Sequence, residues 1–244
     1  VLAGFRSARG TAVAEAQSVG VVVRPGAAAL LSSDFNFNGA EFFTAAALLG
    51  QRTPPRAPWD AGRLVVADAS ALTLNGQFET AAARAPTQGI GRVAEVDIGG
   101  ARIAVVDQAG DPTLAPDFLQ LEGVSLSRLN ASVLLGGTRS DTDSGIAITT
   151  SASEVVVANS SAGAVLLPEL TMAATERIDV RAGSVLTAGG ASLGDAPEVI
   201  ASEASGALIR LGTGAASRVD RGSASNATGD VRIAAGARLS ANGA

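Results

Sequence analysis

The stretch that decides the fold reads Ile178-Asp-Val-Arg-Ala-Gly-Ser-Val-Leu-Thr-Ala-Gly-Gly190. Two others, Val231–Gly243 and Leu64–Gly76, repeat its pattern: a short alternating run, a corner of small residues, a second alternating run and a turn that tolerates positive φ. A unit of this kind that recurs in one phase is typical of a stacked solenoid. The sequence therefore predicts architecture more directly than activity.

The repeated pattern also predicts which side chains face the interior. Leu72, Leu186 and Leu239 hold the same place in the three copies, so we expect all three in the core. Because successive side chains of a strand point to opposite faces, Ile178 should point inward and Asp179 toward solvent. The three copies would then stack with their interiors aligned.

Two all-β folds compete for this pattern. Asn75-Gly76 and Asn242-Gly243 are good type I′ hairpin sequences, which favours an antiparallel β-sandwich. However, a small-residue corner splits every copy near its middle, and an antiparallel meander has no reason to bend there at a fixed phase. The sequence therefore favours a parallel β-helix with loop insertions, and the antiparallel β-sandwich remains the alternative.

We divide the chain into a β-rich segment, residues 1–62, that continues into a parallel β-helix, residues 63–244. Three prolines place a surface loop at 51–60, with Trp59 as its anchor. Further loops are expected at 81–91 and 110–118. Short strands are expected at 93–98, 103–106, 132–135, 146–149, 155–158, 165–167, 170–173, 178–180, 185–187, 207–211, 231–233 and 238–240.

Composition excludes several classes of function. The formal net charge is -5 and all 18 basic residues are Arg without a run, so a nucleic-acid partner is not expected. The absence of Cys excludes disulfides and thiolate metal sites. No stretch approaches the ~18 apolar residues of a membrane-spanning helix. The first ten residues lack the apolar core of a signal peptide, so we interpret the chain as an internal fragment of a longer protein.

Several stretches resemble the C-terminal region of filamentous-haemagglutinin-like exoproteins. The resemblance is carried by Val133–Arg139, Val155–Asn159 and Leu167–Ala174 running into Ile178–Leu186, and it extends back through Trp59–Leu64, Leu72–Gly76 and Val23–Gly26. It covers most of the chain, in short, glycine-rich motifs. The resemblance implies a right-handed parallel β-helix from a bacterial protein exported by two-partner secretion.

The resemblance also implies partners and a location. Such proteins pass through a cognate outer-membrane transporter and act at the cell surface or after secretion in adhesion, biofilm formation or display of a terminal module. Host-surface or matrix glycans are therefore expected partners. Two features depart from the family: this chain has no Asn-Pro pair of the secretion module and no Arg-Gly-Asp tripeptide.

The residue inventory restricts catalysis. With no His, Cys, Lys or Tyr, the chain cannot build a Ser-His-Asp triad, a cysteine nucleophile, a Schiff base or a His-ligated metal site. Paired carboxylates are the remaining option, and Asp107, Asp111 and Asp117 lie in one loop. We interpret these three as solvating loop residues, and we expect the other acids to be ordinary solvated groups. No catalytic residue and no cofactor are predicted.

Three further motifs carry weak signals. Asp141-Thr-Asp143-Ser-Gly145 resembles the start of a calcium loop but lacks its third acid, its glycine at position six and its distal glutamate, so Asp141 and Asp143 are minor metal candidates. Asp179 with Arg181, and Asp220 with Arg221, are interpreted as exposed charges, and Leu211–Ala216 as a turn rather than a nucleotide site. Asn130, Asn159 and Asn226 stand in glycosylation sequons whose use stays open.

The sequence thus predicts a non-enzymatic β-helical shaft of a secreted or surface-attached bacterial exoprotein. The alternative is a fragment of a carbohydrate-active β-helix enzyme, which a groove lined by convergent Asp, Glu and Arg would favour. One Trp and no Tyr leave few platforms for stacking sugars, which weighs against the enzyme.

Overall fold

The computed structural model describes residues 2–4, 19–21, 45, 47–51, 60–67, 69–85, 89–143, 145–190, 199–202, 206–213, 217–222 and 228–241. The chain forms two compact units, residues 1–57 and 58–244. In the first unit, β1 (Leu2–Gly4) pairs antiparallel with β2 (Val19–Val21). Trp59 and most of the loop predicted at 51–60 lie outside the described residues.

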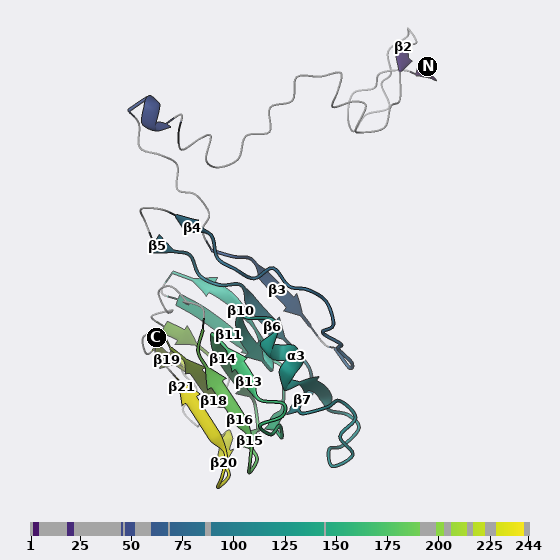
Figure 1. The fold of residues 1–244 in the computed structure, drawn as a ribbon, viewed down its shortest axis with the longest axis vertical. Helices are drawn as coiled ribbons and strands as arrows, with labels where there is room; N and C mark the ends of the chain where they lie inside the picture. The colour runs from purple at the N-terminus through teal and green to yellow at the C-terminus, as the bar shows by residue number, and fades with distance from the viewer. Residues whose placement is uncertain are drawn as a thin grey trace. The chain divides into compact units, whose positions relative to one another are not determined.

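The second unit is built from β-sheets (Figure 1). Sheet 1 contains, in spatial order, β3 (Arg63–Val66), β6 (Glu95–Ile98), β9 (Ser132–Leu135), β14 (Glu169–Ala174) and β18 (Ala207–Gly212). Sheet 2 contains β8 (Leu119–Glu122), β7 (Arg102–Val106), β12 (Glu154–Val157), β15 (Arg177–Val180) and β20 (Asp230–Ile233). Sheet 3 contains β13 (Val165–Leu167), β16 (Val185–Ala188) and β21 (Arg238–Ala241).

Sheet 4 and a small hairpin complete the unit. Sheet 4 contains β10 (Gly137–Thr142), β11 (Gly145–Thr150), β17 (Val199–Ala201) and β19 (Arg218–Asp220). The hairpin of β4 (Arg84–Ala85) and β5 (Gly89–Ile90) lies where the sequence predicted only a loop, at 81–91.

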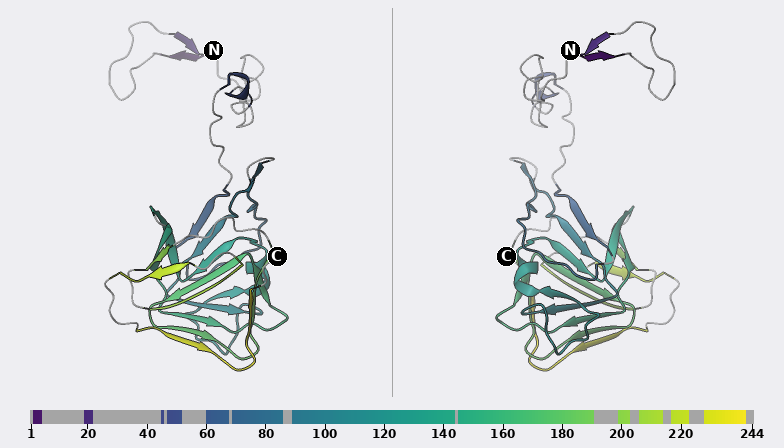
Figure 2. Two further views of the ribbon diagram at one scale, coloured as in Figure 1. Left: turned by 90° about the vertical axis from the view of Figure 1, so that its left-hand side faces the viewer. Right: turned by 90° about the vertical axis from the view of Figure 1, so that its right-hand side faces the viewer.

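Parallel pairing dominates these sheets. Eleven of the fifteen strand pairings in the described part of the chain are parallel, which rules out a purely antiparallel sandwich there. The chain also passes through the sheets in a repeating order. β14, β15 and β16 lie in sheets 1, 2 and 3 in turn, and the strands next to them in these sheets, β9, β12 and β13, follow the same order. In both views of Figure 2, the colour of this unit accordingly passes from blue toward yellow across the successive strands.

The deciding stretch and its second copy stack as predicted. Ile178 pairs with Val231 in sheet 2, and Leu186 pairs with Leu239 in sheet 3. Gly183 lies at the corner between β15 and β16 and has a φ of 80°, a left-handed value that glycine adopts at no steric cost. The register predicted for these two copies is therefore confirmed.

The copy at 64–76 is different, and its predicted equivalence is wrong. Its first strand, β3, pairs with β6 in sheet 1, whereas β15 and β20 lie in sheet 2. Leu186 is fully buried, but Leu72 and Leu239 are only partly buried, although both pack against the core. A short alternating run fits any sheet of such a fold, so the pattern alone did not specify which one.

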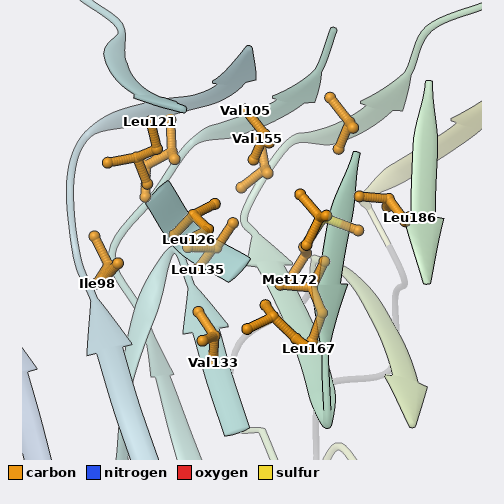
Figure 3. Packing of buried hydrophobic residues seen from close by; sticks show 14 of the residues in the cluster. Ile98, Val105, Leu121, Leu126, Val133, Leu135, Val155, Leu167, Met172 and Leu186 are labelled. Atoms are coloured by element: carbon orange, nitrogen blue, oxygen red, sulfur yellow. The ribbon is translucent and has the colours of Figure 1, made fainter. Parts of the chain in front are cut away.

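The core lies between sheets 1, 2 and 3. Buried Val, Leu, Ile and Met side chains from successive strands point toward one another there, among them Ile98, Val133, Val155, Met172 and Leu186 (Figure 3). All five are at most 1% exposed. With few aromatic residues available, this narrow interior is filled by aliphatic side chains in layers.

Three elements, β8, helix α3 (Gly123–Ser127) and β18, depart from the repeating order. After β7, the chain forms a loop, returns as β8 to pair with the opposite edge of β7, and enters α3, which contacts β13. At the far side of sheet 1, β18 pairs antiparallel with β14. The sequence analysis did not predict β8, α3 or the antiparallel direction of β18.

Sheet 4 covers the outer face of sheet 1. A second apolar cluster joins Leu134 and Ala173 of sheet 1 to Ile146, Ile148 and Ile200 of sheet 4. The β10–β11 hairpin therefore excludes water from side chains of sheet 1 that point away from the main core.

Gly136, between β9 and β10, is expected to be the least replaceable corner glycine. Its φ is 92°, and a Cβ there would lie 2.0 Å from the carbonyl oxygen of Ala173. We expect Gly136→Ala to lower the free energy of unfolding by roughly 3 kcal/mol, because both the strain and the backbone clash must be relieved. Gly183→Ala is the matched control, since its φ is similar and its Cβ would meet open space. Denaturant melts that gave equal losses for the two variants would contradict this account.

Candidate functional site

A buried ion pair lies beneath the β10–β11 hairpin. The guanidinium Nε of Arg139 donates to Asp97 Oδ1 at 2.7 Å, and its backbone N–H donates to Asp97 Oδ2, also at 2.7 Å. Asp97 is 0% exposed, and the Arg139 side chain is 2% exposed. The other guanidinium nitrogens of Arg139 donate to Ser132 Oγ and to the carbonyl oxygens of Ser132 and Val96. The guanidinium thus fastens the hairpin to sheet 1.

The network continues across sheet 1. Ser132 Oγ donates to Glu169 Oε1 at 2.7 Å, and Arg210 Nε on β18 donates to Glu169 Oε2 at 2.7 Å. Ser132, Glu169 and Asp97 are all buried. The expectation that the acidic residues are ordinary solvated groups is therefore wrong for this face. The covering hairpin, which the sequence did not place over sheet 1, is the reason.

The exposed end of this network opens into a polar groove of about 280 Å³ lined by Asp60, Arg63, Arg92, Glu95 and Asp141. Arg63 binds Glu95 through Nε at 2.8 Å and Asp141 through Nη2 at 2.8 Å. Arg92 reaches Glu95 at 3.2 Å, and its backbone N–H donates to Asp60 at 2.8 Å. Carboxylates and guanidiniums therefore converge here, and each named carboxylate accepts a hydrogen bond.

A second charged network, a ladder of side chains at the same position of adjacent strands, crosses sheet 2. Arg102, Glu154, Arg177 and Asp230 occupy one row in register on adjacent strands. Arg102 donates to Glu154 at 2.7 Å, and Arg177 donates to the other oxygen of the same carboxylate. Arg102 also binds Asp117 at 2.8 Å. The Glu154 carboxylate thus compensates the guanidiniums of both neighbouring strands.

Hydrogen bonds hold several carboxyls in their ionised form. Burial raises the pKa of Glu154, but hydrogen bonds from Arg177 and Arg102 outweigh it, so that pKa lies below its ordinary value. The hydrogen bond from Arg102 likewise lowers the pKa of Asp117. The backbone N–H of Ser160 lowers the pKa of Asp107, and that of Thr113 lowers the pKa of Asp111. Carboxyls shifted this way are poor general acids near neutral pH.

These shifts predict lower stability in acid. A carboxyl whose pKa is lower in the folded state stabilises the fold above its unfolded pKa, about 3.9 for Asp and 4.3 for Glu, and loses that contribution as the pH falls through the folded pKa. We therefore expect the free energy of unfolding to be constant from neutral pH to about pH 5 and to fall below it. Urea melts over a pH series measure this. Asp117→Asn should flatten the acid slope, and an unchanged slope in that variant would contradict the assignment.

The loop predicted at 110–118 is held down rather than free. Leu114 and Phe118 pack on Ala104, Val106 and Val156 of sheet 2. The guanidinium of Arg102 also lies 3.9 Å from the centre of the Phe118 ring. An ordered polar loop with two apolar anchors therefore covers the outer face of this sheet.

Two of the three acids predicted as loop residues lie close together. Asp107 and Asp111 line one pocket of about 280 Å³, and the pKa of Asp107, which the backbone N–H of Ser160 lowers, is raised slightly by like-charge repulsion from Asp111. Each of the three nevertheless has its own hydrogen-bond donor: the backbone N–H of Ser160 for Asp107, that of Thr113 for Asp111, and Arg102 for Asp117.

The other sequence candidates are placed individually. Asp141 binds Arg63 and Asp143 is exposed, and among the described residues no group of three or more His, Cys, Asp or Glu is arranged to hold a metal. The Nδ2 of Asn159 is buried and donates to two backbone carbonyls, so that sequon is inaccessible in the folded chain, whereas Asn130 is exposed. Asn226 and residues 214–216 lie outside the described residues.

The two exposed-charge pairs are weak contacts. Arg181 Nε lies 3.8 Å from Asp179, whose side chain is 20% exposed rather than free in solvent. Asp220 lies 3.8 Å from Arg218, and both of these side chains are exposed. Exposed pairs of this kind contribute little to stability.

The residues that form the buried networks were missed by sequence reasoning, although a signal was present. Many strands of sheets 1 and 2 begin with a charged residue followed by apolar ones. These first residues are Arg63, Glu95, Glu169, Arg102, Glu154, Arg177 and Asp230. In sheet 2 the sign of this first charge alternates from strand to strand, and that alternation would have predicted the row of Arg102, Glu154 and Arg177.

No known protein family, no curated protein and no solved structure matches this chain in the three comparisons. Within the part of the chain that the structure describes, no helix has the length and apolar character needed to cross a membrane. The site joins strands through compensated charges, and it has one polar groove at Glu95 and another at Asp107 and Asp111.

Proposed function

We propose that residues 58–244 form a right-handed parallel β-helix that serves as a non-enzymatic shaft in a secreted or surface-attached bacterial exoprotein of the filamentous-haemagglutinin type. The observation that carries the proposal is the repeating order of sheets 1, 2 and 3 with strands in register, as in Ile178 opposite Val231 and Leu186 opposite Leu239. Strands stacked this way extend along one direction and present the same outward rows from strand to strand.

The charge ladders support a structural role. In the row of Arg102, Glu154 and Arg177 each charge has its partner on the next strand, so the charges are used to hold strands together. Export would require an outer-membrane transporter acting through a module outside this chain. The outward polar rows suit weak, multivalent contact with host-surface or matrix glycans.

The polar groove favours the second candidate, a fragment of a carbohydrate-active enzyme. Asp60, Glu95, Asp141, Arg63 and Arg92 converge there, as a site for an acidic sugar would require. Against catalysis, the Glu95 carboxylate is already bound by both Arg63 and Arg92, so its oxygens are occupied by groups of the chain itself.

Two measurements on the purified chain separate these candidates. Small-angle scattering should give the cross-section signature of an elongated body, and a panel of acidic and neutral polysaccharides should show no turnover. Turnover that is lost in Glu95→Gln but retained in Asp143→Asn, an exposed acid outside the groove, would establish the enzyme. A compact globular scattering profile would overturn the shaft.

A further inference from the structure

The loop between β7 and β8 holds one peptide bond in an unusual setting, Asp111–Pro112, the single Asp-Pro bond of the sequence. The side-chain amide of Gln120 clamps the residue before it. Gln120 Oε1 accepts the backbone N–H groups of Gly110 and Asp111, each at 2.8 Å. Its Nε2 donates to the carbonyl oxygen of Asp111 at 3.3 Å. Leu114 donates its backbone N–H to the same carbonyl oxygen at 3.3 Å.

Two donors on one carbonyl oxygen polarise that carbonyl. Donors fixed in this way also stabilise the negative charge that develops on the oxygen when a nucleophile attacks the carbon. Leu114 and Phe118 anchor the loop on sheet 2, so Gln120 and Leu114 are held in place by packing. The loop thus supplies the elements of an oxyanion hole around the Asp111 carbonyl.

The carboxylate of Asp111 is tied across the same bond. Its Oδ1 accepts the backbone N–H of Thr113 at 2.8 Å, and the ring closed by this hydrogen bond contains the Asp111–Pro112 peptide bond. The hydrogen bond restricts the torsions of a carboxylate that only Cα and Cβ separate from the Asp111 carbonyl carbon, and restricted motion of this kind favours an intramolecular attack. Pro112 contributes a tertiary amide without an N–H, and it is exposed to the water that hydrolysis consumes.

We propose that the folded chain cleaves itself between Asp111 and Pro112. An Asp111 carboxylate oxygen attacks the Asp111 carbonyl carbon, the bond from that carbon to the Pro112 nitrogen breaks, and the nitrogen takes a proton from solvent to leave as a secondary amine. The resulting cyclic anhydride at Asp111 is opened by one water molecule, which yields the two carboxylates of a C-terminal aspartate. The net change is hydrolysis of one peptide bond, with no cofactor and no turnover on other substrates.

The cleaved chain stays assembled. β6 and β7 precede the bond, and they pair with β9, β8 and β12, which follow it. The product is therefore a nicked body whose fragments, residues 1–111 and 112–244, separate only on denaturation. Such a nick would free a new N-terminus at Pro112 on the surface of the loop.

A simpler interpretation is that Gln120 only orders the loop, in which case folding should protect the bond. Asp-Pro bonds also hydrolyse slowly in unfolded chains, so the decisive quantity is the ratio of native to unfolded rates. The chain is incubated at about pH 6, once with denaturant and once without. At this pH a glutamate with its ordinary pKa of about 4.3 is ionised, so a glutamate in place of Gln120 would have no proton to donate. Denaturing electrophoresis and mass spectrometry then measure the fragments. We expect the native rate to exceed the unfolded rate by about 10-fold or more.

Three variants test the roles separately. Asp111→Asn keeps the side-chain acceptor for Thr113 but removes the carboxylate nucleophile, and should abolish native cleavage. Gln120→Glu keeps the acceptor for Gly110 and Asp111 but removes the donor to the carbonyl, and should slow native cleavage about 10-fold without changing the unfolded rate. Asp117→Asn, in the same loop but away from the bond, is the control that should cleave at the original rate.

Trapping tests the intermediate. Hydroxylamine should convert part of the 1–111 fragment to a C-terminal hydroxamate, because it opens an anhydride faster than water does. A native rate equal to or below the unfolded rate would overturn the proposal. So would cleavage that persists in Asp111→Asn, since the nucleophile is then not the one named.

Discussion

Replacement of Leu186 by aspartate is expected to unfold residues 58–244 or to lower their free energy of unfolding by roughly 4 kcal/mol or more. Leu186 is 0% exposed and stands in register with Val165 on one side and Leu239 on the other. A carboxylate there has no cation and no water, so it must either disrupt the packing of β13, β16 and β21 or take up a proton. Urea melts followed by circular dichroism measure the loss.

Leu166→Asp is the matched control for this change. Leu166 lies next to the Leu186 row on the paired strand β13, but its side chain is 53% exposed. Its replacement should change stability by about 0.5 kcal/mol. Asp179→Ala should also cost little, because its single contact with Arg181 is long at 3.8 Å. Comparable losses in Leu186→Asp and Leu166→Asp would refute the inward register of β16.

Removal of one partner from the Asp97–Arg139 pair is the second large effect we expect. Asp97→Ala leaves the Arg139 guanidinium buried beneath the hairpin, where its remaining hydrogen-bond partners are neutral and the nearest carboxylate, that of Glu95, lies 3.8 Å away. Breaking a buried pair in this way typically costs about 3–5 kcal/mol. The loss should appear in denaturant melts and as faster hydrogen exchange in β10 and β11.

A double variant tests whether the loss of stability comes from the unpaired buried charge. Asp97→Leu with Arg139→Met removes both charges and keeps apolar bulk, so it should recover most of the stability lost in Asp97→Ala. Arg63→Met is the control, because that guanidinium binds at the exposed groove with a side chain 27% exposed. If the double variant is as unstable as Asp97→Ala, the hairpin depends on Arg139 for its backbone contacts rather than for charge.

Much of the fold could be predicted from local pattern. The strands at 132–135 and 165–167 were placed at their observed bounds, and the one at 231–233 one residue short of its observed start at Asp230, because two-residue alternation and small-residue corners are properties of neighbouring residues. The pairing of Ile178 with Val231 could be predicted because the two copies share one phase. The prediction for the third copy, residues 64–76, was wrong because two-residue alternation does not distinguish one sheet from another.

The candidate site could not be predicted because it depends on long-range cover. Asp97 alternates with Val96 and Ile98 and therefore points away from the main core, which by itself implies solvent. It is buried because β10 and β11 fold over that face, and the pattern of residues 137–150 does not specify where the hairpin lies. Likewise, the Gln120 clamp joins residues that are close only because β8 pairs parallel with the edge of β7 opposite β12.

The position of β8, on the edge of β7 opposite β12, affects which strands of sheet 2 unfold locally first. β8 protects the edge of β7, and α3 lies against β13, whereas β20 and β21 each pair with a described strand on one side only. In a linear array, each strand is protected by its neighbours, so opening starts where a neighbour is missing and spreads inward. We therefore expect β20 and β21 to exchange their amide protons before β15 and β16, and β7, which lies between β8 and β12, to be among the last strands of sheet 2 to exchange.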